Sequence, residues 1–305
     1  MRNLVLVKNE HGMALVITLL VIVLLTAMVV EFSYGVYIGT NNLYNWRDAQ
    51  RLSLMAKSGV NVTARMLKDI ANATEYKTQN HIEMPVENPF KDFQGNIKIS
   101  VEDETAKFNL NSLVREGGDR AVNMGAYNAL KRLLSVLSLD ERIADRIVDW
   151  IDENSEVKIS GGEIGAKNTF LDSTDELLLM RGITKQDYDT LVPYITVCGS
   201  KGMLYVNINR AGIPVIRSVA DSVKEQDAER IINHRNLSPF NGEPWQIVGQ
   251  LQGIVNGFAT ESGVFLTAEG QYFSITSTAT SGGVKRIIDM VLNTTKNRIE
   301  YWKEY

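Results

Sequence analysis

The sequence predicts an α+β protein in which a long amino-terminal helix precedes a small antiparallel sheet, and a large helical domain is inserted into that sheet. Three observations support this prediction. An apolar run near the amino terminus continues into residues with helical spacing. Alternating apolar residues mark strands within 96–113 and 273–293, and helix-type patterns fill the chain between these segments. The 305 residues suffice for one large domain or two modest ones.

The overall charge and the cysteine content set limits on function. The formal net charge is −4, which argues against a strong general attraction for nucleic acid or anionic lipid. The chain has one cysteine, Cys198, so no intrachain disulfide can form.

The apolar run from Met13 to Val30 predicts a membrane-spanning helix. Its 18 residues would span about 27 Å as a helix, close to the thickness of a bilayer's hydrocarbon core. Twelve of them are Leu, Ile or Val, which favours insertion by about 4 to 7 kcal/mol. A cleavable secretory signal is the alternative, but only a weak cleavage site follows, at Ser33–Gly35. Helical spacing continues to about Ala73.

The sheet is predicted from two segments. In 96–113, Ile97, Ile99 and Val101 alternate as in a half-buried strand, a turn follows near Asp103–Thr105, and a second strand is expected. In 273–293, two strands flank the sequence Ser281-Gly282-Gly283, which is a hairpin signal.

The block between these strands, residues 119–262, predicts an inserted α-helical domain. Three sequences of the form Ser-x-x-Glu, which begin at Ser138, Ser173 and Ser222, are predicted to cap helices. An apolar stripe after the first is expected to lie in the core: Ile143, Ile147, Trp150 and Ile151.

One acidic segment, 149–163, has the spacing of a cation-binding loop. Counted from Asp152 as position one, Asn154 is third, Glu156 is fifth and Glu163 is twelfth, as in an EF-hand. Position six is Val157, where such a loop normally needs glycine. Asp145, Asp149 and Asp152 share one helix face, so a solvated acidic face and a calcium site both remain open.

Enzymatic activity is not predicted. The three histidines, His11, His81 and His234, have no serine or cysteine partner nearby in the sequence, and no glycine-rich phosphate loop or Cys/His metal spacing occurs.

A short polar leader that ends in Gly12, followed by Met-Ala-Leu-Val and a long apolar helix, resembles the class III signal of type IV pilins and type II secretion pseudopilins. The resemblance implies that a prepilin peptidase cleaves after Gly12 and that Met13 becomes the methylated amino terminus. It also implies that the apolar helix serves first as an anchor and then as part of a filament core.

The fifth mature position distinguishes this sequence from most of those proteins. Most members carry glutamate there, and this chain has Ile17. A charge in the membrane costs about 3 kcal/mol unless it is paired, and in the family its partner is taken to be the terminal amine of the next subunit up the filament. A subunit at the tip has no such neighbour. The chain therefore resembles the K-type minor pseudopilins of type II secretion (the GspK family), which are also the largest of the set.

This resemblance implies a function and an organisation. The function is to nucleate or cap a pseudopilus for protein export, and the protein is a single-pass protein of the bacterial inner membrane with its carboxy-terminal domain in the periplasm. The implied partners are the I-type and J-type minor pseudopilins, the major pseudopilin and the prepilin peptidase. The implied parts are a leader (1–12), a transmembrane part (13–30), a pilin-like helix with the first strands (31–118), the insertion (119–262) and the last strands (263–305).

The K-type family has a similar Trp-Ile-Asp-x-Asp…Gly-x-Glu element and is described as calcium-binding. The resemblance implies Ca²⁺ ligands at Asp152, Asn154 and Glu163, with Glu156, Asp172 and Asp175 as further candidates. Asn154 replaces a carboxylate of the family and keeps an oxygen without the charge, so a lower affinity is expected.

The insertion also resembles helix-hairpin-helix and SAM-like modules, at 206–240 and around Met180–Thr184. DNA-binding versions use a glycine-rich hairpin, whereas the hairpin position here reads Asp221-Ser222-Val223-Lys224. A scaffold that does not bind nucleic acid is therefore expected. Two alternatives remain open: a minor pilin of a type IV pilus, and a membrane-anchored DNA-binding protein.

Overall fold

The computed structural model describes residues 10–72, 79–86, 94–117, 121–153 and 165–305. The chain divides into two compact units, Met1–Leu54 and Met55–Tyr305.

The first unit is helical in its described part. Helix α1 (Glu10–Asn72) has 63 residues, which corresponds to a length of about 95 Å, and its residues up to Leu54 belong to this unit. Within the described residues, α1 is the one helix long and apolar enough to cross a membrane, and none of its most apolar window is buried. The expected continuation of the apolar run into a long helix that ends near Ala73 is confirmed.

The second unit contains a five-stranded antiparallel sheet in the order β1-β2-β7-β8-β9. Its strands are β1 (His81–Val86), β2 (Asn96–Asp103), β7 (Tyr272–Ser281), β8 (Val284–Asn293) and β9 (Arg298–Glu304). The carboxy-terminal part of α1 packs on this sheet: a Cβ on Gly59 would lie 2.8 Å from Ser277 Oγ and 3.0 Å from Ile99 Cδ1. Glycine at this position therefore permits the close approach of helix and sheet.

The predicted hairpin and first strand are confirmed. Strands β7 and β8 are joined at Gly282 and Gly283, whose φ values of 54° and 83° are those that a tight two-residue hairpin turn needs. Ile97, Ile99 and Val101 of β2 are buried, as their alternation indicates.

Other parts of the sheet prediction are wrong or incomplete. The expected second strand in 96–113 is only β3 (Phe108–Asn109), and it pairs with β4 (Ile195–Thr196) in a separate two-stranded sheet. Strands β1 and β9 were not predicted. Every residue of β9 is exposed, so this edge strand has no buried face that would impose an apolar alternation.

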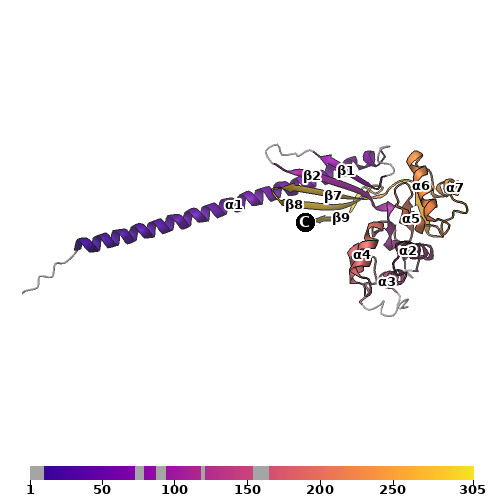
Figure 1. The fold of residues 1–305 in the computed structure, drawn as a ribbon, viewed down its shortest axis with the longest axis horizontal. Helices are drawn as coiled ribbons and strands as arrows, with labels where there is room; N and C mark the ends of the chain where they lie inside the picture. Colours follow the sequence, from indigo (N-terminus) through magenta and orange to yellow (C-terminus); the bar gives the residue numbers. More distant parts are fainter. Residues whose placement is uncertain (1–9, 73–78, 87–93, 118–120, 154–164) are drawn as a thin grey trace, which may run out of the picture. The chain divides into compact units, whose positions relative to one another are not determined.

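The inserted elements follow β2 and return the chain to β7. They are η1 (Glu104–Ala106), β3, η2 (Leu110–Ser112), α2 (Met124–Val136), α3 (Arg142–Ile151), η3 (Thr174–Leu179), α4 (Lys185–Leu191), η4 (Val192–Tyr194), β4, β5 (Leu204–Asn207), α5 (Ile213–Ser218), α6 (Glu225–Leu237), α7 (Pro244–Gln252) and β6 (Val264–Thr267). Figure 1 shows the labelled helices α2 to α7 gathered at one end of the five-stranded sheet. The predicted apolar stripe is confirmed as core, since Ile143, Ile147, Trp150 and Ile151 are all buried.

The insertion contains the same arrangement twice. Strand β3 pairs in parallel with β4, and β5 pairs in parallel with β6. In each pair, the last residue of the earlier strand (β3 or β5) begins an Asn-x-Asn sequence, Asn109–Asn111 or Asn207–Asn209. The side chain of its first asparagine accepts a hydrogen bond of 3.0 Å from the backbone N–H of the second. The inserted domain is thus built as two repeats.

Only one of the three predicted capping boxes is confirmed. Ser173 and Glu176 form it at the start of η3. Ser138 has a φ of 59° and lies outside α3, where Asp140 instead accepts from the N–H of Arg142. Before α6, Asp227 accepts from the N–H of Lys224, and Ser222 does not cap the helix. In both places an aspartate near the start of the helix accepts from a backbone N–H, and the predicted serine does not.

Candidate functional site

The residues of the predicted processing site lie at the start of α1. Gly12 and Met13 are both within the helix, and the Met13 side chain is 65% exposed. Ile17, the position where related proteins are expected to carry glutamate, is 56% exposed and lies among exposed leucine, isoleucine and valine side chains. The membrane segment therefore presents an apolar surface with no acidic group from Met13 to Val30.

The carboxylates at the end of α3 are buried. Asp149 lies in the last turn and Asp152 at the C-cap, and both are 0% exposed. The alternative of a solvated acidic face is therefore wrong for these two residues. Asp145 is half-buried and accepts a 2.5 Å hydrogen bond from the Tyr127 hydroxyl. Burial and this bond raise the pKa of Tyr127 to about 12.

Two further candidate ligands are Asp172, which lies just before η3, and Asp175, which lies in its first turn. The Asp172 side chain is 89% exposed and pairs with Lys167 Nζ at 2.6 Å. Asp175 accepts a 2.5 Å hydrogen bond from Tyr188. Because a lysine ammonium already neutralises Asp172, it is the weaker candidate for binding a cation.

The segment between these groups carries the remaining predicted ligands. Asn154, Glu156 and Glu163 lie outside the described residues. Among the residues that are described, no group of three or more His, Cys, Asp and Glu side chains is arranged to hold a metal ion. Trp150 Nε1 donates to Glu176 Oε2 at 3.3 Å, which brings the end of α3 next to η3. Asp152 is thus the predicted ligand that combines a described position with complete burial.

The hairpin glycine of the first helix-hairpin-helix-like copy is covered by a side chain. Gly182 has a φ of 86°, and a Cβ there would lie 2.7 Å from the guanidinium carbon of Arg146. Arg146 Nη1 donates to the carbonyl of Arg181 at 2.6 Å. The backbone at Gly182 is therefore covered by this guanidinium, which also holds the carbonyl of Arg181.

Two buried asparagines, neither of them among the predicted site residues, hold the repeats together. In the first repeat, Asn111 Nδ2 donates to the carbonyls of Leu171 and Val197, both at 2.9 Å, and its Oδ1 accepts from Leu171 N at 2.8 Å. In the second repeat, Asn209 makes the same three bonds with Phe240 and Ala268, at 2.9, 2.9 and 2.8 Å. The repeated Asn-x-Asn sequence was the available signal.

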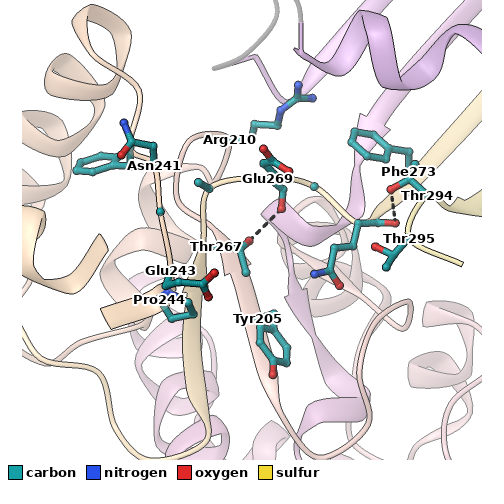
Figure 2. A pocket seen from close by; sticks show the side chains of 15 residues that line it. Tyr205, Arg210, Asn241, Glu243, Pro244, Thr267, Glu269, Phe273, Thr294 and Thr295 are labelled. Atoms are coloured by element: carbon teal, nitrogen blue, oxygen red, sulfur yellow. Dashed lines mark hydrogen bonds between the residues drawn. The ribbon is translucent and has the colours of Figure 1, made fainter. Parts of the chain in front are cut away.

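A cavity of about 780 Å³ opens beside the second repeat (Figure 2). Its walls come from the segment before α7, from the chain between β6 and β7, and from the β8–β9 turn. Glu243 and Glu269 line two of these walls, and the buried side chains of Arg210 and Phe273 also line the cavity. The guanidinium of Arg210 lies over the Phe273 ring, 5.6 Å from its centroid.

Comparison with known proteins agrees with this architecture. Residues 106–200 match the family model of the type II secretion system (T2SS), protein K. Protein K of Pseudomonas aeruginosa is 24% identical over 258 residues, which cover 77% of this chain and 75% of that protein. Protein K of Aeromonas hydrophila is 27% identical over 257 residues, 75% of this chain and 76% of that protein. Over about three quarters of its length the chain is thus similar to protein K of type II secretion systems.

A solved structure extends the likeness to the fold. A chain in the crystal structure of the GspK-GspI-GspJ complex from enterotoxigenic Escherichia coli matches with a TM-score of 0.59 and 17% identity, over 86% of this chain and 97% of that chain. The long helix, the small antiparallel sheet and the helical insertion are therefore features of the protein K fold. The likeness to protein K supports a minor pseudopilin of a type II secretion system. The expectation that this chain has no enzymatic activity stays a prediction.

Proposed function

We propose that this chain is the tip subunit of a type II secretion pseudopilus, anchored by α1 in the inner membrane with its second unit in the periplasm. The observation that carries the tip assignment is Ile17, an apolar residue in an apolar segment. A glutamate there would need a positive group from a neighbour above it in the filament, because an unpaired charge in hydrocarbon costs about 3 kcal/mol. The tip is the one place where no such neighbour exists.

Processing of the leader precedes assembly in this proposal. The prepilin peptidase cleaves after Gly12, and Met13 becomes the methylated amino terminus. Removal of the leader also removes Arg2 and Lys8, whose charges favour the cytoplasmic side of the membrane. Cleavage therefore releases the apolar helix from a strong topological constraint before the subunit enters the filament.

The partners in the proposal are the I-type and J-type minor pseudopilins, as in the GspK-GspI-GspJ complex of the structural relative. The part of α1 that follows the membrane segment supports such contacts. Phe32, Tyr37, Leu43 and Trp46 are 73%, 63%, 68% and 65% exposed. Large apolar side chains that stay exposed along one element commonly mark a contact surface. The helices of two partner subunits are suited to cover this one.

Calcium binding at the end of α3 is part of the proposal. Asp152 would hold the ion with Asn154 and Glu163, and Glu156 and Asp175 are further candidates. The position of Asp152 supports this assignment, because it is fully buried at the C-cap of α3, two residues before Asn154 in the sequence. Oxygen ligands from carboxylates and amides are those that Ca²⁺ prefers. A bound ion would fix the segment after α3 against the insertion.

The decisive experiment is co-purification of the full chain in detergent with I-type and J-type subunits. Wild-type protein should form a stable ternary complex. Leu43→Glu and Trp46→Glu should each abolish it, because they place a charge on the exposed part of α1. Leu237→Glu is the matched control, since Leu237 is 90% exposed and belongs to helix α6 of the insertion. Complex formation by the α1 variants at wild-type levels would refute the proposed contact surface.

A further inference from the structure

The chain crosses between the sheet and the insertion at one place, and a buried carboxylate lies there. The chain leaves the sheet at Asp103, the last residue of β2, and comes back through Gly270 and Gln271 to Tyr272, the first residue of β7. Asp103 pairs with Phe273 across the two strands. Its side chain is 0% exposed.

Asp103, at the end of strand β2, binds groups from two separate segments of the insertion. Its Oδ1 accepts from Thr105 N at 2.9 Å, which begins η1. Its Oδ2 accepts from Asn207 Nδ2 at 2.7 Å and lies 3.6 Å from Arg210 Nε, both in the second repeat. One carboxylate therefore joins the end of a sheet strand to the inserted domain.

The returning chain is tied to the same point. The Thr105 hydroxyl oxygen accepts from the N–H of Gln271 at 2.9 Å and from that of Tyr272 at 3.2 Å. A Cβ on Gly270 would lie only 2.3 Å from Asp103 Oδ2, so the backbone at Gly270 closes directly over the carboxylate. Arg210, Gly270 and Phe273 also line the cavity of Figure 2, which gives water a short path to this joint.

We propose that Asp103 and the groups around it form a proton-sensitive joint between the sheet and the insertion. In the closed joint the carboxylate is shielded from water, accepts hydrogen bonds from Thr105 and Asn207, and pairs with Arg210. When the joint opens, the carboxylate meets water from the cavity, and the amides of Gln271 and Tyr272 lose their acceptor.

The charges around the carboxylate determine the direction of the pH effect. Arg210 is the charged group that faces it from the second repeat. On its own segment, Glu102 and Glu104 both pair with Lys107 at 2.9 Å, and Glu269 beside Gly270 is exposed. Burial raises the pKa of Asp103 to about 6, against the lowering effects of Arg210 and of the hydrogen bonds from Asn207 and Thr105.

The sign follows from linkage. An aspartate exposed to water has a pKa near 3.8, whereas the pKa of Asp103 in the closed joint is about 6. The closed joint therefore binds the proton more tightly. Lowering the pH through 6 therefore favours closure, and at neutral pH the buried charge weakens the joint. Between pH 7 and pH 5 the ratio of closed to open joint should rise about tenfold.

Amide hydrogen exchange on the full chain in detergent micelles tests this inference. After correction for the intrinsic pH dependence of exchange, the protection of the Thr105, Gln271 and Tyr272 amides should rise about tenfold from pH 7 to pH 5. Asp103→Asn should remove this dependence. The matched control is Glu269→Gln, which neutralises a neighbouring exposed carboxylate and should leave the tenfold change intact.

Several outcomes would overturn the inference. One is an unchanged protection in the wild type, and another is the same pH dependence in Asp103→Asn. A third is protection at the joint equal to that of Val101 in the centre of β2 at every pH, because the joint would then open only when the whole unit unfolds. Should Asp103→Asn fail to fold, an NMR titration of the wild-type Asp103 carboxyl carbon decides: a midpoint near 6 supports the joint, and one at or below 4 refutes it.

Discussion

Substitution of Asn209 by alanine tests whether the buried asparagines hold the inserted repeats together. Asn209 is 0% exposed and makes three side-chain hydrogen bonds, two to the carbonyls of Phe240 and Ala268 and one from the N–H of Phe240. Each such bond contributes about 1 kcal/mol net, and a buried N–H left without a partner costs a further 1 to 3 kcal/mol, roughly. Asn209→Ala should therefore lower the free energy of unfolding by about 4 to 6 kcal/mol.

The measurement is urea unfolding of the full chain in micelles, followed by circular dichroism and checked by thermal melting. For a unit of this size, the expected loss corresponds to a fall in Tm of about 10 °C. Asn111→Ala removes the equivalent three bonds of the first repeat and should cost about the same. Asn233→Ala, at an exposed position of α6, is the matched control and should change stability by less than about 0.5 kcal/mol.

The reasoning would be refuted if Asn209→Ala unfolded within about 1 kcal/mol of the Asn233→Ala control. Such a result would mean that water or a backbone shift replaces the lost bonds. A large loss for Asn209→Ala with none for Asn111→Ala would show that the two repeats, although alike in their hydrogen bonds, differ in how much they contribute to the stability of the unit.

Four further predictions concern the membrane segment, the ion and the helix–sheet contact. Gly12→Val should leave a longer, unprocessed protein in the inner membrane by mass spectrometry, whereas the wild type should begin at N-methylated Met13; a mature terminus near residue 35 would favour a secretory signal. Ile17→Glu should give no gain in assembly in a pull-down with partner subunits, and a strict requirement for an acid at this position would contradict the tip assignment. Millimolar Ca²⁺ should raise the Tm relative to chelator, and Mg²⁺ should raise it less; Glu163→Ala should remove most of the response, while an unchanged melting curve without bound calcium by elemental analysis would exclude the ion. Gly59→Val should cost about 1 to 3 kcal/mol by overpacking against Ser277 and Ile99, and a stability equal to wild type in urea unfolding would show that the helix can move away from the sheet.

Features that depend on local pattern could be predicted from consecutive residues. The apolar run and the helical spacing after it predicted α1 to within a residue of its end, because membrane insertion and helix periodicity are properties of consecutive residues. The alternation in β2 and the Gly-Gly turn between β7 and β8 predicted a strand and a hairpin for the same reason. The leader and Ile17 pointed to the family, since a cleavage signal and the residue at a fixed distance from it are local features of the chain.

Features that depend on residues far apart in the chain became visible in the folded protein. The edge strands β1 and β9 could not be predicted, because pairing with a neighbouring strand rather than burial of their own side chains creates them. The spacing of Asp149 and Asp152 showed a shared helix face, but not that both are buried. Asp103 gave no local signal beyond a turn, since Asn207 and Arg210, which bind it, lie more than 100 residues later in the chain. Hydrogen bonds and burial at that range arise from packing, which no short stretch of sequence records.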